Sequence, residues 1–257
     1  MFTGNHLIWL GICALLTCIG LAPLIRRKIP LNKVLSVGCV LAVCSELVKI
    51  FSMVEMLPVA GGVGNYPYLK LPHLPFHLCS VQLILIWCAR FMKPSARRDM
   101  LLAFMYPACA AGAFSALLMP NIFEGPVTIS QAFTHPLPFQ YFTWHSYLLA
   151  LGIFIPLSGE VRLTFRHCLG SMGCIALLGF VSIYVNALCT VPVVDAATGQ
   201  LTAVQRETAN FFFTMQTPVG IPLYSKWQWL LYYLILQLAA WLAILLLYLP
   251  FLRKKKT

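Results

Sequence analysis

Charged side chains, and acidic ones in particular, are scarce in this chain. Only 10% of its 257 residues are charged, whereas a soluble domain carries about 25%. Asp and Glu together number seven, while hydrophobic residues make up 60% of the sequence. This balance excludes an ordinary soluble protein. It indicates an all-α membrane protein that crosses the bilayer several times, built as a single domain over residues 1–257.

Several familiar motifs are missing as well. The ten cysteines include no Cys-x-x-Cys pair, and most lie within apolar runs, where cysteine behaves as a small hydrophobe. Cys79 and Cys189 are the exceptions, and in an oxidising space these two thiols can either stay free or form a disulfide. The net charge of +11 is not arranged as a basic stripe interleaved with aromatic residues. We therefore expect no metal, no cofactor and no nucleic-acid partner.

Long apolar segments are what the chain has in abundance. A helix needs about 20 apolar residues to cross the hydrocarbon core, and continuous apolar runs do not show the alternation of barrel strands. The sequence therefore predicts a bundle of seven transmembrane helices. Their expected positions are residues 7–25, 34–57, 76–92, 100–119, 140–158, 167–190 and 228–251.

The basic residues predict the orientation of this bundle. Of the 18 Lys and Arg residues, 14 lie in the connections 26–33, 90–98 and 159–167 or in the C-terminal tail, which includes Arg253 and Lys254. The opposite connections contain only Lys70, Arg206 and Lys226. Because cytoplasmic loops carry an excess of Lys and Arg, we expect the N-terminus outside and the C-terminus in the cytoplasm.

Polar side chains within the predicted spans gather near the outer ends. Such groups are costly in a membrane and are functional candidates by default. His77 and Cys79 lie about 200° apart on a regular helix, so they cannot both face one cavity unless the helix begins between them or is distorted. The base for a Cys79 nucleophile is expected to be His145. The full set of candidates is Cys79 and His145 as catalytic residues, with His77, Glu46, Lys49, Gln82, Asn186 and Asn210 in supporting or substrate-binding roles.

Ordinary structural interpretations of these residues stay open. Glu46 and Lys49 are spaced i, i+3 and can neutralise each other. His145 can make a single structural hydrogen bond at the interface, and Asn186 can link neighbouring helices. His135, in the loop before the fifth span, is expected to be solvated or to cap a helix.

Three segments together resemble the YwaF-type bacterial integral membrane family: Pro-Phe-His-Leu-Cys at 75–79, Trp-His at 144–145, and the run from Asn210 to Leu223. The resemblance covers essentially the whole chain and implies a multi-pass location in the bacterial cytoplasmic membrane. A distant eukaryotic relative of that family is similar to cysteine-dependent acyltransferases that move fatty acyl chains between phospholipids. Its nucleophile and base match Cys79 and His145. Many bacterial relatives carry an acidic residue after the cysteine, where this chain has Ser80 and where Glu46 is the candidate replacement.

The resulting hypothesis is an acyl-transfer enzyme that acts on phospholipid or another amphiphile at the extracytoplasmic side. Cys79 attacks an ester, His145 moves the proton, and Glu46 or a backbone carbonyl orients the imidazole. Asn186 or Asn210 donates to the oxyanion. Two alternatives are a non-enzymatic lipid or small-solute binding protein or transporter with an outward-facing polar pocket, and a membrane subunit of a larger complex.

Overall fold

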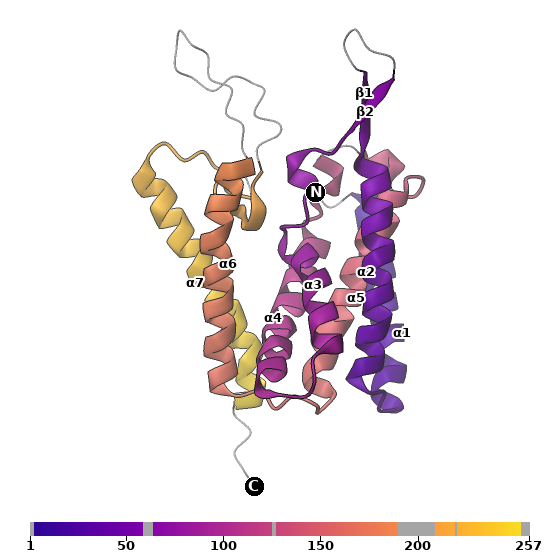
Figure 1. Cartoon of the computed structure of the whole chain (residues 1–257), viewed down its shortest axis with the longest axis vertical. Coiled ribbons are helices and arrows are strands. Elements are labelled where there is room, and N and C mark those ends of the chain that lie inside the picture. The colour runs from indigo at the N-terminus through magenta and orange to yellow at the C-terminus, as the bar shows by residue number, and fades with distance from the viewer. Residues whose placement is uncertain (1–2, 59–63, 125–126, 190–208, 219, 253–257) are drawn as a thin grey trace. The chain divides into compact units, whose positions relative to one another are not determined.

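The computed structural model describes residues 3–58, 64–124, 127–189, 209–218 and 220–252. Over these residues the fold is all-α apart from one small hairpin, as the apolar runs predict (Figure 1). The α-helices are α1 (Gly4–Arg26), α2 (Leu31–Met53), α3 (Leu78–Phe91), α4 (Ala96–Leu118), α5 (Pro136–Leu157), α6 (Phe165–Cys189) and α7 (Lys226–Leu252). The hairpin consists of β1 (Glu55–Pro58) and β2 (Asn65–Tyr68), paired antiparallel.

Each predicted span overlaps one of these helices, but several boundaries differ, and α4 and α5 start at Ala96 and Pro136 rather than at residues 100 and 140. The second span was expected to reach residue 57, whereas α2 ends at Met53 because residues 55–58 pair with 65–68 as strands. The third was expected to start at residue 76, whereas α3 starts at Leu78. Residues 74–77 before it form a turn that follows the short 3-10 helix at Leu71–His73.

Among the described residues, five helices are long and apolar enough to cross a membrane: α1, α2, α4, α6 and α7. The 14 residues of α3 rise only about 21 Å, short of the roughly 30 Å hydrocarbon core. The 22 residues of α5 are long enough, but polar side chains in its first half lower its mean hydropathy. The chain is thus a membrane protein with several apolar helices, and the count of seven spans and the orientation stay predictions.

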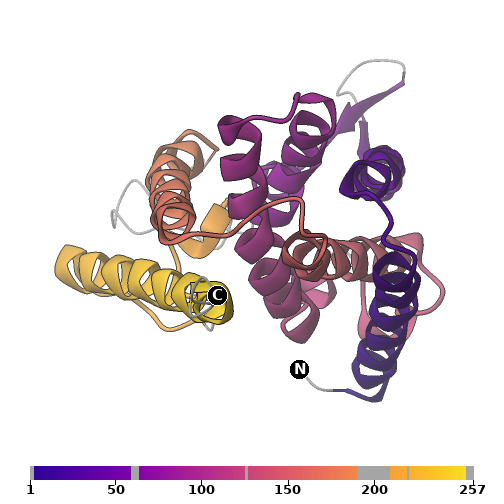
Figure 2. The same ribbon diagram turned by 90° about the horizontal axis from the view of Figure 1, so that it is seen from below.

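The chain divides into two compact units. The first contains residues 1–52, 78–171 and 243–257, and the second contains 53–77 and 172–242. Within the first unit α3 packs on α4, α4 on α5, and α5 on α1 (Figure 2). The α4–α5 contact is especially close, because a Cβ added to Gly152 would lie 2.5 Å from the backbone nitrogen of Ala110.

The core of the first unit surrounds α5. Trp9 from α1 stacks on Phe142 with ring centroids 4.7 Å apart, and its indole N–H donates to the carbonyl of Ala132 at 2.9 Å. His6, fully buried, bonds the carbonyl of Leu117 at the end of α4. These contacts hold α5 in the interior of the unit and so fix the position of every side chain it carries.

Helix α2 buries an apolar face that includes Leu35 and Ala42, and single hydrogen bonds add to this packing. The Tyr147 hydroxyl of α5 donates to the carbonyl of Val34 at 3.0 Å. It reaches that carbonyl because Gly38 has no side chain, since an added Cβ there would collide with the same hydroxyl. At its first residue, the Leu31 N–H donates to the Glu160 carboxylate at 2.6 Å. This contact places the 158–164 connection beside the start of α2.

The basic connections of the first unit meet at one end. The Arg98 guanidinium at the start of α4 donates to the Asn32 side chain at 2.6 Å and to the carbonyl of Ala89 at 2.9 Å. The starts of α2 and α4 and the end of α3 therefore lie together, and we call this region the basic end. The distribution of Lys and Arg predicts that these connections share one side. Arg206 and the basic residues of the tail 253–256 lie outside the described residues.

The second unit contains the hairpin and most of α6 and α7. The Trp241 indole of α7 donates to the Met172 carbonyl of α6 at 3.1 Å. Glu55 and Lys70 form an ion pair with a 2.7 Å separation at the base of the hairpin. A turn between the two helices, residues 210–216, is bound to α6 and α7 by side-chain hydrogen bonds.

Candidate functional site

Cys79 is the second residue of α3, while His77 lies outside the helix. The helix thus begins between the two residues, which is the one case in which their helical separation of about 200° does not apply. The first N–H groups of a helix lack intrahelical acceptors and carry partial positive charge. The Cys79 thiol therefore stands at the end of a helix that favours negative charge.

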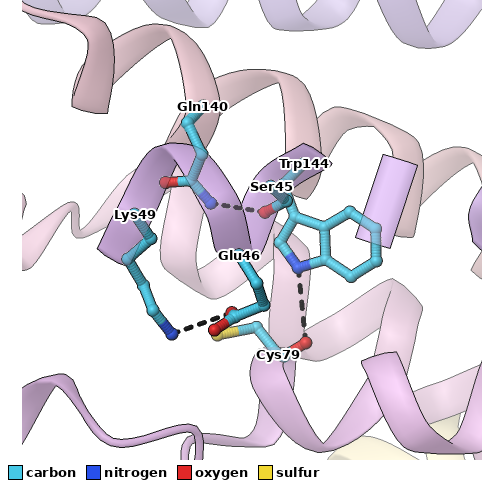
Figure 3. Close-up of polar contacts among 6 residues, drawn as sticks. All are labelled: Ser45, Glu46, Lys49, Cys79, Gln140 and Trp144. Atoms are coloured by element: carbon cyan, nitrogen blue, oxygen red, sulfur yellow. Dashed lines mark hydrogen bonds and ion pairs between the residues drawn. The ribbon is translucent and has the colours of Figure 1, made fainter. Parts of the chain in front are cut away.

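An ion pair from α2 lies beside this thiol. Lys49 Nζ is 2.8 Å from Glu46 Oε1, with the two side chains 16% and 25% exposed. Figure 3 shows the Cys79 sulfur pointing toward this pair. The mutual neutralisation expected from the i, i+3 spacing is confirmed, and the pair also supplies polarity next to the candidate nucleophile.

Trp144 connects α5 to the start of α3. Its indole N–H donates to the Cys79 carbonyl at 3.3 Å (Figure 3). One turn earlier on α5, the Gln140 amide donates to the Ser45 hydroxyl of α2 at 2.6 Å. The three helices are thus joined by hydrogen bonds around Cys79. Sequence reasoning missed these two bonds, although an indole immediately before the predicted base was a visible signal.

His145 is 2% exposed on α5. Its Nδ1 lies 2.7 Å from the carbonyl oxygen of Tyr141. Because a carbonyl only accepts, Nδ1 must carry the proton, and Nε2 is then the basic nitrogen of the neutral ring. The group that orients the imidazole is thus a backbone carbonyl, whereas the other candidate, Glu46, is bound to Lys49.

Tyr141 stands beside His145, the candidate base. Its ring centroid is 4.2 Å from that of His145, and His145 and Cys79 are both on helices of the first unit. Its hydroxyl donates to the carbonyl of Ala116 on α4 at 2.9 Å. Sequence analysis did not single out this residue, because a tyrosine in an apolar span resembles an ordinary interfacial anchor.

Gln82 lies one turn after Cys79 and is fully buried. Its carbonyl oxygen accepts a hydrogen bond from the Cys109 thiol of α4 at 3.2 Å. Within the described part of the chain its amide nitrogen has no hydrogen-bond partner. A buried donor of this kind is energetically costly, so Gln82 is a candidate for binding an oxygen of a ligand.

Cys79 and Cys189, the two cysteines outside the apolar runs of the sequence, are free thiols in the structure. Cys79 belongs to the first unit and Cys189 to the second. A free thiol is the form from which a nucleophilic thiolate is generated.

In the second unit Asn186 binds the turn at 210–216. Its Oδ1 accepts from the Phe211 N–H at 2.8 Å, while its Nδ2 donates to the Phe211 carbonyl and to the Thr214 hydroxyl, both at 3.0 Å. The side chain is fully buried. Every polar atom of its amide is thus used within the protein, as the structural interpretation of this residue requires.

Asn210 closes the same turn. Its Oδ1 accepts from the N–H groups of Met215 and Gln216 at 3.1 Å, and its Nδ2 donates to the Gln216 carbonyl at 3.0 Å. The turn contains two residues in the left-handed region, Phe212 with φ 58° and Phe213 with φ 55°. Side chains with a Cβ adopt this region at a cost, so the asparagine hydrogen bonds hold a strained backbone.

The histidines that precede α3 and α5 take different positions. The His77 ring packs edge-on against Phe211 with centroids 4.9 Å apart, so it joins Asn186 and Asn210 at the turn in the second unit. His135 caps α5 by accepting from the Leu137 N–H at 3.2 Å, and its expected capping role is confirmed.

His73 lies four residues before His77, in a short 3-10 helix over Leu71–His73. Among the described residues, no group of three or more His, Cys, Asp or Glu side chains is placed to hold a metal ion.

The predicted site residues therefore fall into two groups. Glu46, Lys49, Cys79, Gln82 and His145 belong to the first unit, where the first three are in direct proximity and Trp144 joins the helix that carries His145 to Cys79. His77, Asn186 and Asn210 belong to the second unit, where they surround Phe211.

Comparison of the sequence with known proteins identifies the family of the chain. The family model described as the TMEM164 family matches residues 1–248. This label differs from the YwaF label that the motifs suggested, and it carries no information on a bacterial source. No curated protein and no solved structure is detectably similar to the chain.

Proposed function

The chain belongs to the TMEM164 family, and we propose that it is a cysteine-dependent acyltransferase that acts on membrane phospholipid. The observation that carries the proposal is the arrangement around Cys79. Its backbone is held by Trp144, the residue next to His145, and the Nδ1–carbonyl contact leaves Nε2 of that histidine as the base. A nucleophile, a base and a group that orients the base are the components of covalent acyl transfer.

In the first step, the Cys79 sulfur attacks the ester carbonyl of a donor phospholipid. His145 Nε2 takes the thiol proton, and the bond between the carbonyl carbon and the glycerol oxygen breaks. The departing lysolipid oxygen receives that proton, and a thioester forms on Cys79. In the second step, an acceptor hydroxyl loses its proton to His145 and attacks the thioester, which releases the thiol and the new ester.

For the oxyanion we propose Gln82 as the donor. Its amide nitrogen is buried without a hydrogen-bond partner among the described residues, and residues three apart are neighbours on a helix surface. The amides of Asn186 and Asn210 are engaged in the 210–216 turn. Loss of one oxyanion donor typically lowers kcat about a hundredfold or more. We therefore expect Gln82→Ala to reduce turnover by that order.

The test is intact-mass analysis of the purified protein after incubation with phospholipid. An acyl-sized adduct is expected on the wild type and on Cys88→Ala, which removes an exposed cysteine from the same helix. The adduct is expected to be absent from Cys79→Ala and to form more slowly on His145→Ala. Full turnover by folded Cys79→Ala protein would contradict the proposal.

The same variants separate the enzyme from its alternatives. A lipid or solute carrier in which Glu46 and Lys49 contact the ligand would show changed binding or uptake in Glu46→Gln, with no covalent adduct on any variant. A membrane subunit of a larger complex would show neither an adduct nor ligand binding when purified alone.

A further inference from the structure

A groove lies between α1, α2 and α5 in the first unit. Its volume is about 340 Å³ and its lining is mostly apolar. Its lining includes Leu16 of α1, Lys33 and Val37 of α2, and Thr143, Ala150 and Leu151 of α5. The lining includes none of the side chains to which acyl transfer is assigned above.

The dimensions of the groove suit one hydrocarbon chain. From Thr143 to Leu151 the α5 wall rises about 12 Å, close to the roughly 15 Å that one leaflet contributes to the hydrocarbon core. The volume is at the lower end of the roughly 300–1,000 Å³ range of small-ligand sites. A single acyl chain therefore fits better than a whole lipid molecule, whose head group would stay outside.

The charge at one end of the groove identifies the head group. Lys33 lines the groove at the basic end. Two arginines near it are bonded to neutral side chains: Arg98 donates to Asn32, and Arg90 donates to Ser36. Both ion pairs formed by the described residues lie elsewhere.

Two carboxylates lie at this end: Asp99 in the first turn of α4, and Glu160, which accepts a hydrogen bond from the first N–H of α2. The protein thus gathers cations here without matching them with an equal number of anions. A membrane phosphate is the complementary partner, because anionic lipids attract Lys and Arg at the membrane surface.

We propose that this groove binds one acyl chain of an anionic phospholipid and that the phosphate of the same lipid pairs with Lys33. This site is separate from the one at Cys79 and does not depend on acyl transfer. Its occupant fills the space that α2 leaves beside α1 and α5, so the bound lipid forms part of the wall of the first unit.

The first arm of the test concerns the head group. The full chain is purified and analysed by native mass spectrometry after exposure to dioleoyl phosphatidylglycerol or dioleoyl phosphatidylcholine. One phosphatidylglycerol is expected to be retained in preference to phosphatidylcholine. Lys33→Gln is expected to lower that retention about fivefold. Lys93→Gln, which removes an exposed charge from another basic connection, is expected to leave it unchanged.

The second arm concerns the chain. Val37→Trp fills the groove from a position that is 55% exposed, so it is not expected to disturb folding, and it should abolish the retained lipid. Val40→Trp is the matched control, since Val40 is 64% exposed on the same helix and outside the groove lining.

Three results would overturn the proposal. These are equal retention of the two lipids, equal loss of phosphatidylglycerol in both lysine variants, and unchanged retention in Val37→Trp. An acyl adduct on Cys79 is read separately, so failure of this site and failure of the proposed enzyme are distinguishable.

Discussion

Asn186 holds Phe211 by both of its main-chain groups. The amide oxygen accepts from the N–H at 2.8 Å and the amide nitrogen donates to the carbonyl at 3.0 Å, so the side chain imitates the pairing of a neighbouring strand. Both residues are fully buried. The contact joins α6 to the turn before α7, and its loss leaves two buried main-chain groups unpaired.

We expect Asn186→Ala to destabilise the protein by about 1–3 kcal/mol, the usual cost of a buried polar group without a partner. Asn186→Asp should not restore stability, because a carboxylate repels the Phe211 carbonyl while still accepting from its N–H. Thermal unfolding in detergent measures both effects. Unchanged unfolding with reduced turnover would instead assign Asn186 to catalysis.

The left-handed conformation of Phe213 predicts that glycine destabilises the protein less than alanine at this position. Replacing an ordinary residue with Gly normally costs more than replacing it with Ala. At φ 55° the Cβ is penalised by roughly 1–2 kcal/mol. We therefore expect Phe213→Gly to unfold at a higher temperature than Phe213→Ala, since both lose the same ring. The opposite order would mean that the turn relaxes out of this conformation.

The closeness of α4 and α5 predicts that Gly152 tolerates no side chain. A Cβ at this position would approach the Ala110 backbone to 2.5 Å, and overpacking of this kind costs about 1–3 kcal/mol. Gly152→Ala should lower the midpoint of thermal unfolding. Gly173→Ala is the matched control, because nothing lies within 4 Å of the added Cβ on α6. Equal midpoints for the two variants would contradict the close approach.

The Trp144 hydrogen bond predicts that a substitution at this position changes kcat more than KM. Trp144→Phe keeps an aromatic ring but removes the N–H that donates to the Cys79 carbonyl. If the indole positions the nucleophile, kcat should fall about tenfold, the equivalent of one hydrogen bond of about 1.4 kcal/mol, while KM changes little. A rise in KM with unchanged kcat would assign the indole to lipid binding instead.

The positions of the helices were predictable because each apolar run carries its own signal. The end of α2 was not, since the strand pairing of Glu55 with Tyr68 involves a partner thirteen residues away. The same limit applies to the site. The order of the spans predicts that polar residues such as Cys79 and Glu46 lie near corresponding ends of their spans, but not which of them are in contact.

The bonds from Trp144 to Cys79 and from Asn186 to Phe211 join residues 65 and 25 positions apart. Sequence alone marks these residues as polar without indicating their partners. For Asn186 and Asn210, polarity near a span end suggested catalysis, whereas the structure uses both amides to hold a turn. A signal for this was present in the Asn-Phe-Phe-Phe run, where bulky residues follow an asparagine able to bond its own loop.

The attachment of α2 has a practical consequence for handling the protein. Glu160, Tyr147 and Gln140 each fasten this helix through one hydrogen bond, to Leu31, Val34 and Ser45. Hydrogen bonds are stronger in a medium of low dielectric constant and weaken where water competes. The hydrocarbon around the protein thus contributes to holding in place the helix that carries Glu46 and Lys49. A solubilising medium that admits water weakens these three bonds, so the choice of detergent affects how firmly a purified sample holds the helix that carries Glu46 and Lys49.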